Sequence, residues 1–171
     1  MRTLMLLRHA KSSWDQPGLD DFERPLNARG QNAATRMGRY LARKRQRPDL
    51  FLCSSALRAR ATCDLVQAEI DDIRVVHLDD LYLASSAKLL EACQQVEPEI
   101  ETLALIGHNP GLEALALRLV GSGSARERQR MATKFPTGAL AVIEFECDGW
   151  TQIGDGAGRL ARFVCPKDLE D

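Results

Sequence analysis

The sequence predicts an α/β protein, a three-layer α/β/α sandwich with a largely parallel central sheet. Short apolar runs such as residues 3–7, 50–53 and 102–106 have no polar alternation, which is typical of strands buried on both faces. Segments with apolar residues three and four positions apart follow them and are typical of amphipathic helices. A chain that alternates strands with helices favours a parallel sheet covered on both faces, with right-handed crossovers.

The expected elements follow one another in a regular order. Strands are expected over residues 3–7, 50–53, 73–78, 102–106, 137–146 and 159–164, with 149–153 as a further candidate. Helices are expected over residues 28–46, 56–69, 86–96, 110–119 and 125–132, with a turn at 121–123. Asn27, Ser54 or Ser55, and Asn109 are the expected N-caps, because their side chains accept backbone N–H groups. We expect these elements to form a single domain over residues 1–171.

A long polar segment, residues 10–26, separates the first strand from the first helix. Loops longer than about 12–15 residues are uncommon in compact domains and are often functional. Because the segment starts where the first strand ends, we expect it to arch over that end of the sheet. Trp14 and Phe22 are the side chains expected to hold it in place.

The composition bounds the class of protein. The chain has 171 residues, 44% of them hydrophobic and 27% charged, which is typical of a folded globular domain. A net charge of −1 predicts no broad basic surface for nucleic acid, and no apolar run reaches the ~20 residues of a membrane span. Five cysteines without a C-x-x-C pair predict free thiols rather than disulfides or a zinc site. We therefore expect a cytoplasmic monomer that binds neither nucleic acid nor membrane.

Charged and titratable side chains follow three of the predicted buried strands. Arg8 and His9 end the first strand, Arg58 lies in the first turn of the helix after the second, and His108 follows the fourth. Parallel strands share one carboxyl edge, which is where ligands bind in open α/β sheets. Two arginines and two histidines that converge there would bind a dianion, of which a phosphoryl group is the natural candidate.

This set of residues predicts phosphoryl transfer. Neutral His9, with one ring nitrogen held as a donor to a carbonyl, would attack phosphorus with the other nitrogen and form a phosphohistidine intermediate. Arg8, Arg58 and a protonated His108 would bind the phosphoryl oxygens and neutralise their charge. The arginines therefore make a metal unnecessary, and we expect no cofactor.

Asp80 or Asp79, which follow the third strand, would protonate the leaving group and later activate water. Both are equally typical of a plain turn. The other candidates also have structural interpretations when each is taken alone: Arg58 as a surface ion-pair partner, His108 as a capping or core histidine, and the Arg-His pair as packing. The functional prediction depends on their combination, because independent local patterns place them at strand ends.

Four motifs spread along the chain carry these residues. They are L-R-H-A at residues 7–10, R-P-L-N-A-R-G at 24–30, S-S-A-L-R-A-R-A-T at 54–62 and I-G-H-N-P at 106–110. They resemble the R-H-G, R-P-L-[ST]-x-x-G, S-x-x-x-R-A-x-x-T and strand-end G-H motifs of the histidine phosphatase (phosphoglycerate mutase-like) superfamily. The compact length and residues 9–12, 81–84, 107–111 and 166–169 most resemble its SixA branch. That branch is named for dephosphorylating phosphohistidine on phosphorelay proteins.

The resemblance implies a phosphoglycerate mutase-like fold and a metal-independent phosphatase activity. It implies that His9 is the nucleophile and that Arg8, Arg58 and His108 form the phosphate pocket. The implied partner is a phosphorylated protein that carries phosphohistidine. A phosphatase for a small phosphate ester is the alternative, and a non-catalytic phosphate-binding module is less expected because all four pocket residues are present.

Two positions depart from the family pattern. Ala10 stands where the superfamily usually has Gly, and it adds a methyl group near the phosphate site. Asp80 lies nearest to the place of the family's Glu and is one methylene shorter. A phosphohistidine substrate depends less on such an acid, because a protonated phosphoimidazole expels neutral imidazole whereas a phosphate ester expels an alkoxide.

Overall fold

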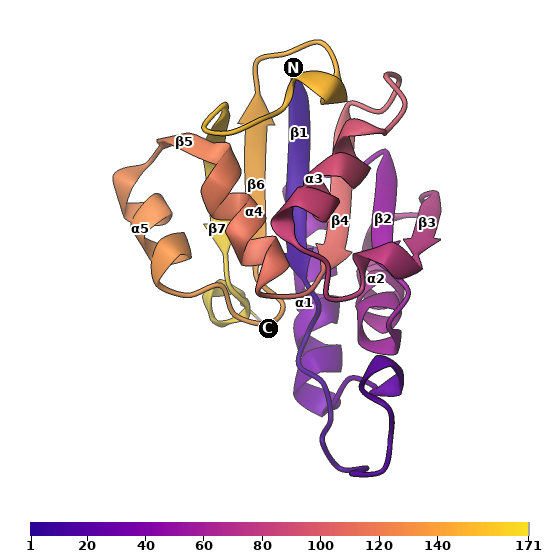
Figure 1. Ribbon diagram of the computed structural model, residues 1–171. Helices are drawn as coiled ribbons and strands as arrows, with labels where there is room; N and C mark the ends of the chain where they lie inside the picture. The colour runs from indigo at the N-terminus through magenta and orange to yellow at the C-terminus, as the bar shows by residue number, and fades with distance from the viewer. Residues whose placement is uncertain (171) are drawn as a thin grey trace.

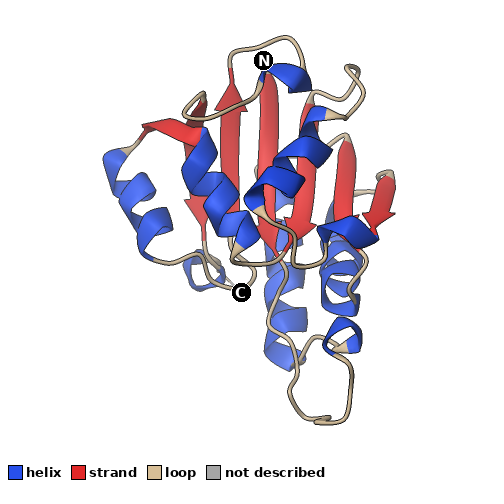
Figure 2. Ribbon diagram, in the orientation of Figure 1, coloured by secondary structure: helices blue, strands red, loops and turns tan. Residues whose placement is uncertain are grey.

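A computed structural model describes residues 1–170; Asp171, the last residue of the expected domain, lies outside the described residues. A seven-stranded sheet is covered by helices on both faces, which confirms the predicted three-layer α/β architecture (Figures 1 and 2). The strands are β1 Arg2–Arg8, β2 Leu50–Ser54, β3 Val75–Leu78, β4 Thr102–Gly107, β5 Val120–Gly123, β6 Leu140–Phe145 and β7 Gly158–Val164. The α-helices are α1 Ala28–Arg43, α2 Leu57–Ile70, α3 Ser86–Gln94, α4 Gly111–Leu119 and α5 Ala125–Thr133.

The sheet is largely parallel, as predicted, with strand order β3-β2-β4-β1-β6-β7-β5. β6 runs antiparallel to β1 and β7, while every other pairing in the sheet is parallel. β1 pairs with β4 so that Arg8 lies opposite Gly107, and β2 pairs with β4 so that Cys53 lies opposite Ile106. This register brings the carboxyl ends of β1, β2 and β4 to the same edge of the sheet.

Successive side chains of the central strands enter different cores. Leu4 and Leu6 belong to the core under α3 and α4, whereas Met5 and Leu7 belong to the core under α1 and α2. All four side chains are almost fully buried. A strand with apolar side chains on both faces requires both faces of its sheet to be covered, here by two helical layers. The apolar run at the start of the chain is therefore explained by its place at the centre of the sheet.

Several element boundaries differ from the sequence predictions. Residues 121–123 belong to edge strand β5 rather than to a turn, and 150–152 form a 3₁₀ helix rather than a strand. Gly121 has no side chain to signal a strand, and a Cβ there would lie 2.0 Å from the carbonyl oxygen of Gly156. The backbone of β5 therefore approaches its neighbour closely at a glycine, and residues 121–123 lack the β-branched side chains by which a strand is usually recognised. α1 ends at Arg43 rather than at residue 46.

The predicted N-caps are correct at one helix and shifted at two. The Asn27 side chain accepts the N–H of Gly30 and caps α1 as predicted. α4 begins at Gly111 with Pro110 at the cap position, although the Asn109 side chain still accepts the N–H of Glu113. α2 begins after Ala56, whose own N–H donates to the Ser54 hydroxyl.

The loop over residues 10–26 extends beyond the carboxyl edge of the sheet (Figure 1). Its two ends are joined by a β-bridge between Ser12 and Leu26. Phe22 packs edge-on against Tyr82, as expected of an anchor. Trp14, however, is 75% exposed and stacks against the Arg24 guanidinium, 3.5 Å from the ring centroid, so it does not anchor the loop in a core.

Gly30 packs α1 directly against the start of this loop, and we expect Gly30→Ala to destabilise the protein by about 2 kcal/mol. A Cβ on Gly30 would lie 2.0 Å from the Lys11 carbonyl oxygen, a contact that requires the backbone to move. This cost outweighs the higher helix propensity of Ala. The free energy of unfolding, measured with urea, tests the expectation. Gly149→Ala, where nothing lies within 4 Å, is the matched control, and an equal change in both variants would contradict it.

Candidate active site

A pocket of about 510 Å³ lies at the carboxyl ends of β1, β2 and β4. Four of the five side chains in the predicted catalytic set line it: Arg8, His9, Arg58 and His108. His9 is 7% exposed, Arg58 3% and His108 2%. Residues from three distant parts of the chain therefore meet because parallel strands end at one edge.

One ring nitrogen of His9 is held in a hydrogen bond, and the other is free. Its Nδ1 lies 2.7 Å from the carbonyl oxygen of Ala10, which can only accept, so Nδ1 carries the proton. Burial lowers the pKa of His9 from 6.5 to about 4, and the Arg58, Arg8 and Arg24 guanidiniums act in the same direction. At neutral pH the ring is therefore uncharged, and its Nε2 has a lone pair with which to attack an electrophile.

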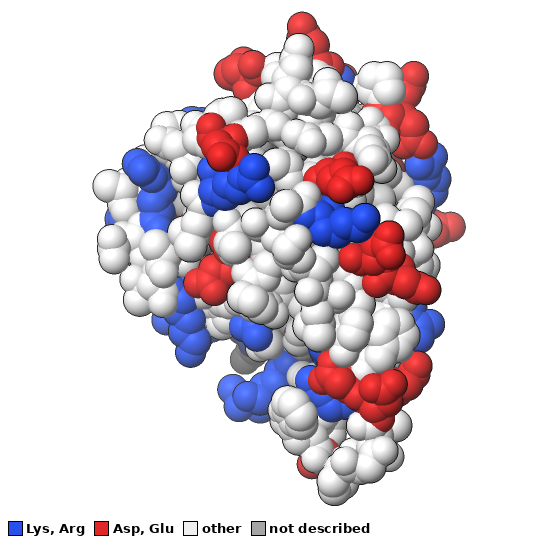
Figure 3. Space-filling model, in the orientation of Figure 1, with Lys and Arg blue, Asp and Glu red and all other residues white. Residues whose placement is uncertain are grey.

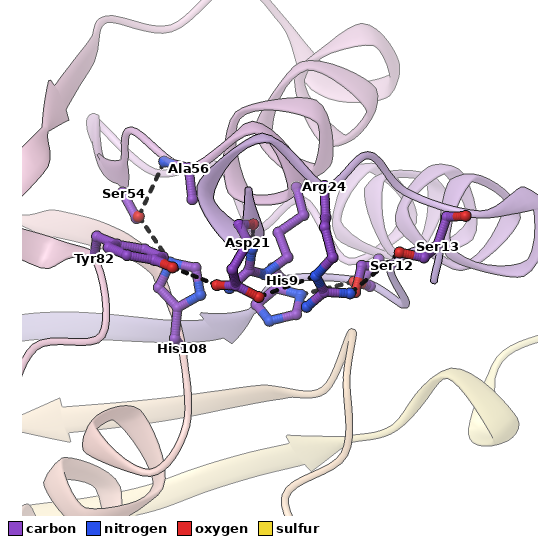
Figure 4. Close-up of polar contacts among 11 residues, drawn as sticks. His9, Ser12, Ser13, Asp21, Arg24, Ser54, Ala56, Tyr82 and His108 are labelled. Atoms are coloured by element: carbon purple, nitrogen blue, oxygen red, sulfur yellow. Dashed lines mark hydrogen bonds and ion pairs between the residues drawn. The ribbon is translucent and has the colours of Figure 1, made fainter. Parts of the chain in front are cut away.

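His108 lies beside His9, with ring centroids 5.0 Å apart (Figure 4). Its Nε2 is 2.7 Å from the Ser54 hydroxyl, which also accepts the N–H of Ala56. Burial lowers the pKa of His108 to about 3, with further lowering from His9 and Arg58. The prediction of a protonated His108 is thus not met by the protein groups alone, which keep the ring neutral at pH 7. A bound dianion would raise this pKa and favour protonation.

The two predicted arginines are held by different acceptors. Arg8, at the end of β1, donates to the Phe135 carbonyl at 3.0 Å. Arg58, in the first turn of α2, donates to the Asp21 carbonyl at 2.6 Å and to the Asp21 carboxylate at 3.0 Å. The Nε of each guanidinium is buried and has no hydrogen-bond partner within residues 1–170. Both side chains are thus oriented, and each guanidinium keeps an N–H donor that no described protein group accepts.

Asp21 is the carboxylate of this pocket, and the sequence analysis did not select it. It accepts hydrogen bonds from the Tyr82 hydroxyl, from Arg24 Nε at 2.9 Å and from Arg58 (Figure 4). The hydrogen bond from Tyr82, followed by those from Arg24 and Arg58, lowers the pKa of Asp21 to about 2. A carboxylate ionised this strongly cannot serve as a proton donor near neutral pH. Arg24 and Tyr82 lay in the motifs at residues 24–30 and 81–84, whereas Asp21 lay in a loop without a recognisable pattern.

Asp80 and Asp79, the predicted acids, lie outside the pocket. Both are exposed in the 3₁₀ helix Asp79–Leu81. The Asp80 side chain is 78% exposed and lies 3.6 Å from Lys88 Nζ, in a separate hollow. The structure therefore brings neither carboxylate to the histidines, and their catalytic role stays a prediction that this geometry does not favour.

Ala10, the departure from the R-H-G motif, is accommodated without strain. Its φ is not positive, and its side chain is fully buried in a small apolar cluster with Leu26 and Ala34. Its N–H donates to the Thr62 hydroxyl at 3.0 Å, and that hydroxyl donates to the Arg58 carbonyl at 2.7 Å. Thr62 thereby joins the segment that carries His9 to the helix that carries Arg58.

The arrangement suits nucleophilic chemistry on a dianionic group. A neutral imidazole with a free nitrogen lies among guanidiniums that can bind oxygens, and a second imidazole lies beside it. Among residues 1–170, no group of three or more His, Cys, Asp or Glu side chains could hold a metal ion. In the same part of the chain, no helix combines the length and apolarity needed to cross a membrane.

The low pKa values of the two histidines predict that stability falls as pH falls from about 7 to 5. Both pKa values lie below 6.5 in the folded state, so the unfolded chain binds more protons in this range, and each histidine costs about 2 kcal/mol at pH 5. Asp21, whose pKa is about 2, affects stability only below about pH 5, as its unfolded-state pKa near 3.8 is approached. Urea unfolding at both pH values measures the effect. His9→Gln and His108→Gln should each remove about half of it, and a pH-independent stability in the wild type would contradict the expectation.

Comparisons with known proteins agree with this geometry. A family model described as the histidine phosphatase superfamily (branch 1) matches residues 4–82, which include Arg8, His9 and Arg58. A Mycobacterium tuberculosis protein described as uncharacterized is 33% identical over 163 residues, covering 94% of this chain and 100% of the relative.

Solved structures extend the likeness over almost the whole chain. The crystal structure of an Agrobacterium tumefaciens SixA protein, assigned as a phosphohistidine phosphatase, is 34% identical with a TM-score of 0.81, covering 96% of this chain and 98% of that one. A Nakamurella SixA protein with the same assignment is 27% identical with a TM-score of 0.82, covering 96% of each chain. The chain therefore belongs to the histidine phosphatase superfamily, and within it to the SixA-type branch.

Proposed function

We propose that this protein is a phosphatase that removes the phosphoryl group from phosphohistidine on a phosphorelay protein, through a covalent intermediate on His9. The observation that carries the proposal is the neutral His9 ring, whose Nδ1 is held by the Ala10 carbonyl while its Nε2 is free beside Arg8, Arg58 and His108. SixA relatives assigned as phosphohistidine phosphatases support the substrate class. The five free cysteines support a cytoplasmic location.

In the first step, His9 Nε2 forms a bond to phosphorus as the P–N bond to the substrate imidazole breaks. The electron pair of that bond stays on the leaving imidazole, which departs neutral if its other nitrogen carries a proton. Arg8 and Arg58 bind the phosphoryl oxygens as their charge redistributes. The dianion raises the pKa of His108, which then donates a hydrogen bond from the same site.

In the second step, water attacks phosphorus, the P–N bond to His9 breaks with its electron pair on Nε2, and inorganic phosphate leaves as H2PO4⁻ with both protons of the water. His9 recovers its neutral form with the proton on Nδ1, because the Ala10 carbonyl accepts from that nitrogen throughout. Neither step requires a carboxylic acid at Asp80. This is consistent with an imidazole leaving group, which needs less assistance than an alkoxide.

The rim of the pocket supports a protein substrate over a small phosphomonoester. Trp14 and Leu83 line the pocket and are 75% and 54% exposed. Leu83 adopts a positive φ of 50°, which holds a large apolar side chain at the pocket edge in a backbone region that is unfavourable for it. Exposed apolar side chains beside a catalytic pocket are typical of surfaces that contact another protein.

We expect His9→Ala to abolish turnover of a phosphohistidine peptide and to leave the fold intact. The wild type, quenched rapidly during turnover, should contain protein-bound phosphate that is labile to acid and stable to base, and this label should be missing from the variant. Circular dichroism and urea unfolding report on the fold. Phosphate that stays bound to His9→Ala would place the intermediate on another residue, and its absence from the wild type would exclude a covalent intermediate.

The variants Asp80→Asn and Asp21→Asn each replace one carboxylate by an amide, the first outside the pocket and the second inside it. Asp80→Asn should change kcat/KM for a phosphohistidine peptide by less than about twofold, because the side chain is exposed and outside the pocket. Asp21→Asn should lower it by about tenfold or more, because Arg58, Arg24 and Tyr82 lose the charge that orients them. The same assays with an alkyl phosphate show whether the effect depends on the leaving group, which is an alkoxide there and an imidazole in the peptide. Large and equal losses from Asp80→Asn on both substrates would restore Asp80 as the general acid.

A further inference from the structure

A second groove lies next to the phosphate pocket and is larger, with a volume of about 760 Å³. It is formed by the first half of α1, the end of α5 with the loop after it, and the segment that follows β7. Its lining includes six cations and, among residues 1–170, no carboxylate. The cations are Lys11, Arg29, Arg36, Arg130, Lys134 and Lys167. We call it the basic groove.

Four of these cations are exposed and have no ion-pair partner within the described residues: Lys11, Arg29, Lys134 and Lys167. Arg130 differs, because it pairs with Asp168 at 2.6 Å and with Glu127 at 3.0 Å. Figure 3 shows Lys and Arg side chains at the lower end of the molecule, beside a group of Asp and Glu side chains, with further Lys and Arg side chains over the rest of this face. The lining of the basic groove, with six cations, is a local positive surface in a protein with a net charge of −1.

The position of Arg29 adds to the positive charge of the groove. It lies in the first turn of α1, where the helix dipole is itself positive and favours acidic side chains. A cation here does not stabilise the helix, and it adds its charge to that of the helix N-terminus. Lys134 follows α5 directly, and Lys167 lies in the 3₁₀ helix Pro166–Asp168. Cations from three distant segments thus face one groove.

The basic groove is continuous with the phosphate pocket. Lys11 and Thr137 line both of them. Lys11 follows His9 by two residues, so the groove begins close to the place where a phosphoryl group at His9 would lie. Trp14 and Leu83, in contrast, line the phosphate pocket only.

We propose that the basic groove binds an acidic segment of the substrate protein, adjacent in space to its phosphohistidine. This inference rests on the proposed function. It adds that the surface of the substrate protein around its phosphohistidine is acidic. Exposed lysines on flexible stems match several carboxylates spread over a protein surface. A small anion would instead require a compact set of buried donors like that around His9.

The test uses two phosphohistidine peptides of equal length, one with Asp and Glu beside the phosphohistidine and one with Ser and Gln. The wild type should hydrolyse the acidic peptide with a kcat/KM about tenfold higher at low salt, as expected from three or four exposed charge pairs. The triple variant Arg29→Glu, Lys134→Glu, Lys167→Glu should lose this preference. It should hydrolyse p-nitrophenyl phosphate at the wild-type rate, because none of the three residues lines the phosphate pocket.

Arg43→Glu is the matched control for the single variant Arg29→Glu, which should lose part of the preference. Arg43 is exposed, has no ion pair within the described residues, and lies at the other end of α1, about 20 Å from Arg29 along the helix axis. Reversing the charge of Arg43 should leave the preference for the acidic peptide unchanged. An equal loss in Arg43→Glu would show that only the overall charge of the protein matters and would overturn the proposal.

The remaining outcomes separate this proposal from the function on which it rests. Equal kcat/KM values for both peptides in the wild type would overturn the proposal that the groove binds an acidic segment. They would leave the proposed phosphatase function unaffected. No hydrolysis of either peptide would overturn both. If the triple variant instead raises the KM for a hexose bisphosphate and treats the two peptides as the wild type does, the groove binds a small anion and the proposal is wrong.

Discussion

The carboxylate of Asp21 is the interaction on which the pocket depends. Three guanidiniums and two imidazoles cannot be held together at the end of a sheet by packing alone, because like charges repel and buried charges lose hydration. Asp21 supplies an anion to Arg58 and Arg24 and receives the Tyr82 hydroxyl. It comes from the loop that arches over the sheet edge, so that loop is part of the site's electrostatics rather than a passive cover.

The same electrostatics determine the protonation of the histidines. Burial and nearby guanidiniums keep both rings neutral, and the Ala10 carbonyl selects the tautomer of His9 that leaves Nε2 free. A dianion in the pocket would offset the positive charge and raise the pKa of His108. The proposed nucleophile is thus neutral before a substrate binds, and we expect the second histidine to become a charged donor once an anion is bound.

The sequence predicted the fold and much of the pocket, because both follow from local patterns. Buried strands were visible as apolar runs, and Arg8 ends β1, while His9 and His108 directly follow β1 and β4. Strand order was not predictable, since it is set by crossovers rather than by any one segment, and Asp21 was missed because its role depends on the path of a loop. Asp80 was selected by its distance along the chain from the third strand, yet a 3₁₀ helix leaves it exposed away from the pocket.

Two kinds of positive charge therefore lie side by side in this protein, and they have different physical properties. The guanidinium of Arg58 is buried, fixed by hydrogen bonds and little screened by salt, which suits a group that must bind one phosphoryl dianion in a defined geometry. Arg29, Lys134 and Lys167 are exposed and unpaired within the described residues, so salt screens them and their geometry is loose. Such charges speed the encounter with an acidic partner and contribute little to the reaction itself. Recognition of the phosphoryl group and recognition of the protein that carries it are thus separated in space, and salt concentration acts mainly on the second.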